Sequence, residues 1–195
     1  PVRRPLPTGP VENSPCLRLR IMPPAPAALT GLEAVAYPDF GLFLWRGPRA
    51  FIALRCGPIG QNGQGGHAHN DQLAVEIEID GVAWTRDPGS FVYTADLAER
   101  DCYRSVMAHF APRRGSGEPA RLLAPFRLED RAGAKLVRFG DDMVGRHVGF
   151  GAIEDGAIVI EDTPGEGEHV LRSPEDLARL WGLILPFSPG YGRKG

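Results

Sequence analysis

The chain has 195 residues, of which 43% are hydrophobic and 24% charged, and its formal net charge is −2 at pH 7. This length and composition predict a globular fold with one domain, alone or with a linker, that is large enough to bury a core. The near-neutral charge supplies no basic field for nucleic acid, and no apolar run approaches the roughly 20 residues of a membrane-spanning helix, so no nucleic-acid partner and no membrane span are expected.

Residues 1–30 contain eight prolines and are expected to form a linker or an extended arm, with one short strand at residues 17–21. The chain begins at Pro1, without a methionine or a signal peptide, so we expect it to be a fragment. On this interpretation the proline-rich segment joins a missing N-terminal part to a domain that covers residues 31–195.

Short strand-like segments recur from residue 32 onward, separated by Gly, Pro and Asp turns. We expect strands at residues 41–46, 50–55, 73–79, 82–86, 136–139, 148–152 and 157–162. Their lengths and spacing predict a mainly β fold, an antiparallel β-sandwich. One short C-terminal helix is expected after Ser173, because a serine cap, a proline at the first helical position and two acidic residues precede an apolar run.

Residues 65–73 (GGHAHNDQL) contain the most informative motif of the chain, since His67, His69 and Asp71 alternate at every second position. In an extended backbone this spacing places all three side chains on one face. The motif leads into an alternating strand, so the candidate site lies where a loop enters a sheet. A solvated turn is the simpler alternative, because a metal site needs a third or fourth ligand.

Further metal ligands are available downstream. Residues 80–81 (DG) predict a tight hairpin turn, and the returning strand carries Asp87 toward the end of the hairpin that holds His69. From spacing alone Asp87 falls a few residues short of His69, and a bend at Pro88 would be needed to close the gap. His109 is a further candidate. Two histidines and one aspartate with an open fourth position suit Zn²⁺ by ligand type.

Several blocks of the sequence resemble the C-terminal domain of heparinase II/III-like polysaccharide lyases. The main blocks are residues 37–41 (YPDFG), 56–60 (CGPIG), 66–73 (GHAHNDQL), 87–93 (DPGSFVY), 103–105 (YRS) and 108–109 (AH). Residues 145–151 (GRHVGFG) and 188–192 (SPGYG) also look like segments of this family. Phe110 follows the last histidine where the family usually has asparagine, which affects the expected substrate specificity more than the metal.

The resemblance implies roles for individual residues. His67 matches a residue at the substrate cleft with a part in catalysis, and the zinc ligands would be His69, Asp87 and His109. Substrate contacts are less strongly implied for Tyr93, Arg104 and His147. The planar guanidinium of an arginine suits a sugar carboxylate. Each of the three also has a structural interpretation. Tyr93 would lie at the edge of the core, Arg104 would form an ion pair with an acid such as Asp101, and His147 would be an ordinary loop histidine.

The reaction implied by the resemblance is β-elimination on a uronic-acid glycan, as in glycosaminoglycans or alginate. A base removes the proton at carbon 5, the sugar linked through oxygen 4 leaves, and an unsaturated uronate remains. His67 would lower the barrier by neutralising the neighbouring carboxylate.

The family's base and acid lie in an N-terminal α/α toroid that this chain lacks, so the isolated domain is expected to be a poor enzyme. The resemblance also implies a periplasmic or secreted protein that acts on an acidic polysaccharide. Two alternatives stay open: a metal-stabilised carbohydrate-binding module without chemistry, and a domain that serves the biosynthesis or export of a non-uronate polymer.

Overall fold

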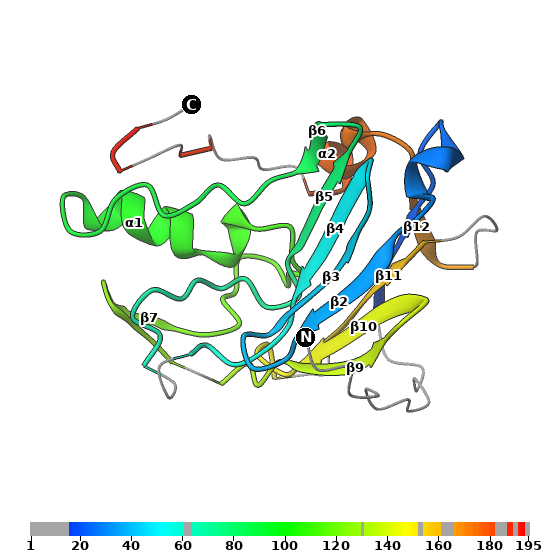
Figure 1. Ribbon diagram of the computed structural model, residues 1–195. Helices are drawn as coiled ribbons and strands as arrows, with labels where there is room; N and C mark the ends of the chain where they lie inside the picture. Colours follow the sequence, from blue (N-terminus) through cyan, green and yellow to red (C-terminus); the bar gives the residue numbers. More distant parts are fainter. Residues whose placement is uncertain are drawn as a thin grey trace.

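The structure is a computed structural model that describes residues 16–60, 64–129, 131–151, 154–160, 166–181, 187–188 and 191–193. The first half of the proline-rich segment therefore lies outside the described residues. The described strands form two five-stranded sheets and one two-stranded sheet, with two α-helices and short 3-10 helices beside them (Figure 1). No helix in this part of the chain is long and apolar enough to cross a membrane.

The first sheet is fully antiparallel and follows the order of the sequence. It consists of β2 (Glu33–Tyr37), β3 (Leu42–Arg46), β4 (Ala50–Arg55), β5 (Val75–Ile79) and β6 (Val82–Thr85). The predicted strands are confirmed within about two residues, and β2 was not predicted. Burial alternates along β5 as expected, since its valine and isoleucines are buried and its two glutamates are exposed.

The second sheet has the strand order β12 (Glu168–Leu171), β1 (Cys16–Ile21), β11 (Glu154–Val159), β10 (Asp142–His147) and β9 (Lys135–Phe139). The strand expected at residues 17–21 is confirmed as β1. It runs parallel to both of its neighbours, whereas β9, β10 and β11 pair antiparallel.

The strand predicted at residues 148–152 is wrong. The strand of this region is β10, which ends at His147, and the chain then turns. His147 Nδ1 accepts the backbone N–H of Gly149 at 3.1 Å, and Gly151 donates to the carbonyl of Val148 at 3.0 Å. Gly151 has a φ of 78°, which an extended strand does not allow. Residue 152 lies outside the described residues.

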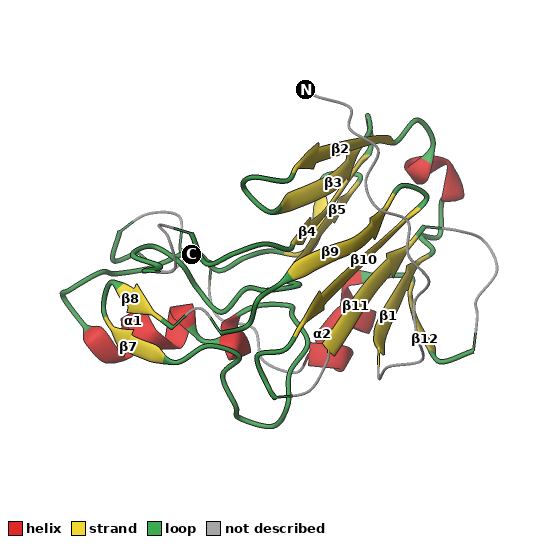
Figure 2. Ribbon diagram, turned by 90° about the horizontal axis from the view of Figure 1, so that it is seen from below, coloured by secondary structure: helices red, strands yellow, loops and turns green. Residues whose placement is uncertain are grey.

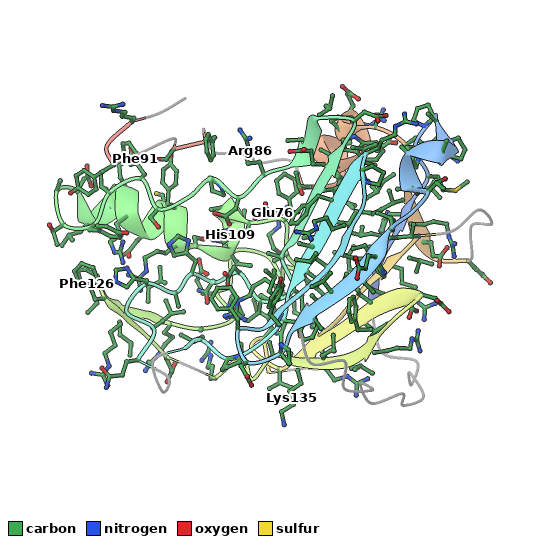
Figure 3. All side chains as sticks on the ribbon, viewed as in Figure 1. Glu76, Arg86, Phe91, His109, Phe126 and Lys135 are labelled. Carbon is green, nitrogen blue, oxygen red and sulfur yellow. The ribbon has the colours of Figure 1, made fainter. Side chains whose placement is uncertain are left out.

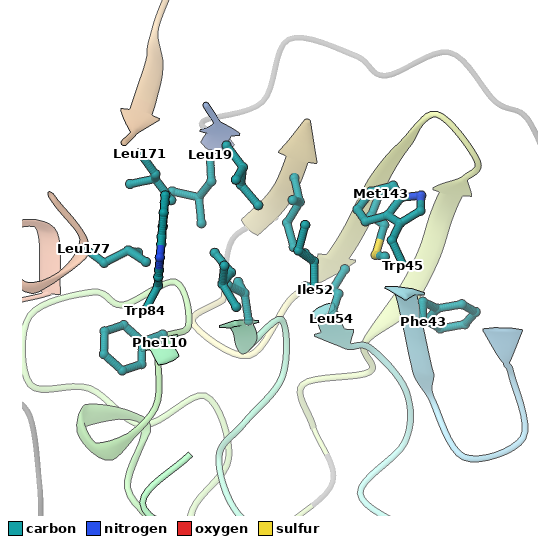
Figure 4. Close-up of a cluster of buried hydrophobic side chains, with 14 of the residues drawn as sticks. Leu19, Phe43, Trp45, Ile52, Leu54, Trp84, Phe110, Met143, Leu171 and Leu177 are labelled. Carbon is teal, nitrogen blue, oxygen red and sulfur yellow. The ribbon is translucent and has the colours of Figure 1, made fainter. Parts of the chain in front are cut away.

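The two sheets pack face to face and bury one core, which confirms the predicted β-sandwich (Figure 4). The helix α2 (Pro174–Trp181) forms where it was predicted and covers one end of the core. The core side chains from both sheets and α2 include Leu19, Phe43, Trp45, Ile52, Leu54, Trp84, Met143, Ile158, Leu171 and Leu177.

A second region of the molecule lies beside the sandwich and is built from the chain between β6 and β9 (Figures 1 and 2). It contains α1 (Leu97–Arg104), the 3-10 helix η3 (Val106–Ala108), and the hairpin of β7 (Leu122–Ala124) and β8 (Arg127–Leu128). A further 3-10 helix, η1 (Pro26–Leu29), follows β1. Neither α1 nor the β7–β8 hairpin was predicted.

Candidate functional site

The histidine motif lies in a loop, not in a strand. Residues 66–74 form turns, and β5 begins only at Val75. His67 is exposed and His69 is only 7% exposed, so the two histidines do not share one face as an extended backbone would require. The backbone N–H of Asn70 donates to the carbonyl of Arg104 at 2.9 Å, which turns this part of the loop toward α1. The site does lie where this loop enters the sheet.

Leu73 anchors the loop in the core of the sandwich. It has a φ of 63°, a left-handed conformation that is strained for a bulky side chain, and it is 1% exposed. Its side chain fills the space over two glycines of the second sheet. A Cβ added at Gly145 would lie 2.3 Å from Leu73 Cδ2, and one at Gly156 would lie 3.3 Å from Leu73 Cδ1. Glycine at these positions therefore makes room for the anchor.

Three side chains with metal-binding atoms meet at the junction between the sandwich and the second region. They are His69, Asp87 and His109, and one ligand atom of each lies within 4.8 Å of the others. Asp87 Oδ2 lies 2.6 Å from His109 Nδ1, and the two imidazole centroids are 5.3 Å apart. His69 Nε2 lies 3.3 Å from the hydroxyl of Ser90. Figure 3 shows His109 at this junction.

The β5–β6 hairpin and one non-local hydrogen bond bring these residues together. Ile79 pairs with Val82 as predicted, and an extra residue in β6, Trp84, then shifts the register of the returning strand before Asp87. On the other side, the backbone N–H of Val75 donates to the carbonyl of Phe110 at 3.0 Å. This bond places His109 beside the start of β5. The gap that spacing leaves between Asp87 and His69 is thus bridged by His109.

Glu118 ties the two histidine-bearing segments to each other. Its Oε2 accepts from Asn70 Nδ2 at 2.6 Å and from the backbone N–H of Val106 at 2.9 Å. Its Oε1 accepts from the hydroxyl of Ser105 at 2.5 Å. Asn70 is adjacent to His69, and the other two donors lie a few residues before His109. The carboxylate therefore fixes the spacing of the segments from which both histidines project.

The protonation of the three groups depends on burial and on their mutual contacts. Burial lowers the pKa of His69 to about 3, and the positive charge of His109 adds to this effect. Burial also opposes a charge on His109, but the hydrogen bond and charge of Asp87 raise the pKa of His109 above its ordinary value. Burial opposes a charge on Asp87 as well, but the hydrogen bond and charge of His109, with the backbone N–H of Gly89, together lower the pKa of that carboxyl. His69 is therefore neutral, as a metal ligand must be.

The residues at this junction fit a divalent metal ion. His109 Nε2 is buried and has no hydrogen-bond partner among the described residues, which is an uncommon and unfavourable state for a polar atom. Two imidazoles and one carboxylate are ligands that zinc-like ions accept, and a tetrahedral ion with bonds of about 2 Å separates its ligand atoms by roughly 3.3 Å. The three ligand atoms already lie within 4.8 Å of one another, so small shifts of the side chains would bring them to that spacing.

A pocket of about 320 Å³ opens at the exposed His67. Its lining includes Phe40, which is 73% exposed, and the side chains of Arg55 and Asp71. Arg55 Nη2 donates to the carbonyl of Pro58 at 2.6 Å, and its Nε lies 3.8 Å from Asp71 Oδ2. The pocket thus combines a histidine, a cation, a carboxylate and an aromatic ring, a composition suited to a polar ligand with an apolar face.

The remaining candidates from the sequence occupy different surroundings. Tyr93 lies close to His67, with ring centroids 5.6 Å apart. Arg104 is 1% exposed and donates to Asp101 Oδ1 at 3.2 Å and to the carbonyl of Ala124 at 2.9 Å, so we assign it a structural role. His147 is 1% exposed, and its contacts are to the turn that follows β10.

Sequence reasoning missed Glu118 and Ser90, and it did not predict the helix α1. No spacing pattern singles out the first two, since their role depends on contacts between distant segments. The start of α1 had a signal: Asp96 is followed three residues later by Glu99, as in a capping box. Asp96 does cap the helix, and its carboxylate accepts from the backbone N–H groups of Ala98 and Glu99, both at 3.0 Å.

This chain is similar to a known protein family and to solved structures. Residues 30–160 match the family model described as Heparinase II/III-like, C-terminal. Among solved structures, the chain is similar to the heparan sulfate lyase HepC from Pedobacter heparinus, at 21% identity and a TM-score of 0.41, over 60% of this chain and 18% of that one. It is also similar to a heparinase III with methylated lysines, at 18% identity and a TM-score of 0.36, over 62% of this chain and 20% of that one. The match thus spans about a fifth of these solved chains. No curated protein gives a significant match.

Proposed function

We propose, from the premise that this chain belongs to the heparinase II/III-like C-terminal family, that it is the zinc-binding β-sandwich of a polysaccharide lyase. The lyase would cleave uronic-acid-containing glycans by β-elimination. The observation that carries this proposal is the cluster of His69, Asp87 and His109. It lies close to a pocket lined by His67, which is two residues before His69 in the chain. An N-terminal α/α toroid in the same polypeptide would supply the base and the acid.

In this proposal His67 faces the glycan and does not bind the metal. Its exposed imidazole would hydrogen-bond the uronate carboxylate, which makes the proton at carbon 5 more acidic. The base takes that proton, the bond from carbon 4 to the leaving oxygen breaks, and a double bond forms between carbons 4 and 5. The acid protonates the leaving oxygen.

The metal would fix the position of His67 and of its own three ligands. When bound, zinc would supply a fixed positive charge and hold His69, Asp87 and His109 together. Because His69 is two residues from His67, an ordered metal site also orders the loop that presents His67. Ser90, close to His69 Nε2, would restrain the orientation of that ring.

Members of this family typically act outside the cell or in the periplasm, and we propose the same location for this chain. Its partner would be an acidic polysaccharide such as a glycosaminoglycan or alginate. The alternative is a carbohydrate-binding domain without lyase activity. It would be indicated if such a glycan binds but no unsaturated product forms.

The test compares three histidine-to-alanine variants of the chain by elemental analysis and thermal unfolding. His69→Ala should lose its zinc and unfold at a lower temperature, because a site formed only in the folded state adds its binding energy to folding. His67→Ala should keep the zinc, and so should the control His169→Ala, an exposed histidine of β12. Unchanged zinc in His69→Ala, or loss of zinc in His67→Ala, would contradict the assignment. In the toroid-containing protein, His67→Ala should lose most turnover, followed by the absorbance of the unsaturated product.

A further inference from the structure

Exposed aromatic rings gather around His67 from segments far apart in the sequence. Tyr93, Phe126 and Tyr191 are 37%, 43% and 59% exposed. The ring centroid of His67 lies 5.6 Å from that of Tyr93 and 6.1 Å from that of Phe126. Tyr93 in turn lies 6.0 Å from Phe126 and 5.9 Å from Tyr191. Single exposed rings are ordinary, but a contiguous group indicates a binding surface.

One buried arginine of α1 organises this group. Arg100 is 1% exposed, and its guanidinium carbon lies 5.0 Å from the ring centroid of Tyr93 and 4.8 Å from that of Phe126. The same guanidinium donates to three backbone carbonyls, of Pro125 at 2.5 Å, Val92 at 3.3 Å and Gly66 at 3.5 Å.

Each of these carbonyls belongs to the residue immediately before a ring, namely Phe126, Tyr93 or His67. Arg100 therefore fixes both the faces of two rings and the backbone that carries all three. Figure 3 shows Phe126 below α1, near the β7–β8 hairpin. Rings held in this way lose little conformational freedom when a ligand covers them.

The same arginine also adds positive charge beneath the surface, which Asp101 offsets only in part. No carboxylate of the described residues lies within ion-pair distance of Arg100. The neighbouring buried Arg104 pairs with Asp101, whose side chain is 50% exposed and so partly screened. Two buried guanidinium groups thus share one half-exposed carboxylate, and a low-dielectric surrounding extends their field to the rings above.

We propose that Tyr93, Phe126 and Tyr191 form a sugar-stacking platform, organised by Arg100, that holds a ring of an anionic glycan beside His67. The apolar face of a pyranose ring would cover the exposed rings, and its carboxylate or sulfate would lie in the positive field. This inference rests on the proposed function, because it is that function which brings an acidic glycan to His67. It adds a binding subsite outside the pocket of Arg55 and Phe40, and it makes Arg100 a positioning residue.

The test is calorimetric titration of the chain with a heparin hexasaccharide, a β-1,4-linked mannuronate hexasaccharide, and mannohexaose, the neutral counterpart of the mannuronate. At least one anionic hexasaccharide should bind more tightly than mannohexaose. Phe126→Ala should weaken that binding about tenfold, and Phe126→Tyr, which restores a ring, should recover it. Leu123→Ala is the control, since Leu123 is 43% exposed on the same hairpin and has no ring in the platform.

Phe126 is exposed, so its variants test the platform without unfolding the core. Arg100→Lys keeps the charge but loses the planar fork that holds the rings, so it should weaken the binding of the anionic hexasaccharide and of mannohexaose alike. Equal affinities of Phe126→Ala and the unaltered chain would overturn the platform, and so would equal binding of charged and neutral hexasaccharides, or none by any hexasaccharide. These results would leave the zinc content and the elimination reaction untouched, so failure of the platform is distinguishable from failure of the proposed function.

Discussion

Replacing Glu118 by alanine should weaken metal binding from outside the metal centre. The change removes an ionised acceptor of three hydrogen bonds, from Asn70, Ser105 and Val106. A hydrogen bond to a charged group contributes about 1.5–3 kcal/mol. Asn70 keeps its bond to the carbonyl of Ala120 at 2.7 Å, so we count two full bonds and expect a loss of about 3–6 kcal/mol in the free energy of unfolding. The histidine-bearing segments would then move apart, and zinc affinity should fall about tenfold or more.

Competition with a chromophoric chelator measures the zinc affinity, at a temperature where the metal-free variants are folded. Glu118→Gln can keep the acceptor to Asn70 and Val106 and should restore most of the affinity. Glu168→Ala is the matched control, because it removes a buried glutamate that pairs with Arg20 at 2.5 Å in the other sheet. It should lose several kcal/mol of stability, about 3–5 for a broken buried pair, without a change in zinc affinity. A Glu118→Ala variant that is destabilised but binds zinc normally would refute the positioning role.

The other predictions concern the second sheet. Burial lowers the pKa of His147 to about 4 from an ordinary value of 6.5, so the unfolded chain takes up a proton first as the pH falls, and about 3 kcal/mol of stability should be lost between pH 6.5 and 4. Urea unfolding of His147→Gln should show a flatter pH dependence in this window, and an unchanged profile would disprove the assignment. Gly145→Ala should cost about 1–3 kcal/mol and lower zinc affinity, because its Cβ would lie 2.3 Å from Leu73 Cδ2, whereas Gly140→Ala has nothing within 4 Å and should be neutral. Adding Leu73→Ala should recover part of the Gly145→Ala loss in a double-mutant cycle, and strict additivity would contradict the contact.

Local patterns predicted those parts of the fold that local chemistry decides. The β5–β6 hairpin is an example, because its turn residues Asp80 and Gly81 both adopt positive φ, at 54° and 74°, and its strand alternates strictly. The metal ligand set was implied by residue type and family resemblance. Its assembly could not be predicted from spacing, since it depends on the bond between Val75 and Phe110 and on the carboxylate of Glu118.

The missed and misplaced elements lack the periodicity on which such predictions depend. The buried residues of α1 are Arg100, Tyr103 and Arg104, so this helix turns charged side chains inward and shows no apolar stripe. Conversely, Val148 and Phe150 imitate an alternating strand, although the glycines between and after them form a turn. In the first case tertiary contacts override the local pattern, and in the second a local glycine turn does so.

The seating of Leu73 on Gly145 and Gly156 has a consequence for how this fold can vary. The loop that carries His69 is held against the second sheet by Leu73, so its conformation depends on that sheet as well as on the loop sequence. A graft of residues 66–73 onto another β-sandwich, together with Asp87 and His109, should fail to form the centre unless the two glycines are transferred as well. In related sequences, a larger residue in place of either glycine should be tolerated only together with a smaller residue at position 73. Substitutions at these three positions should therefore be correlated.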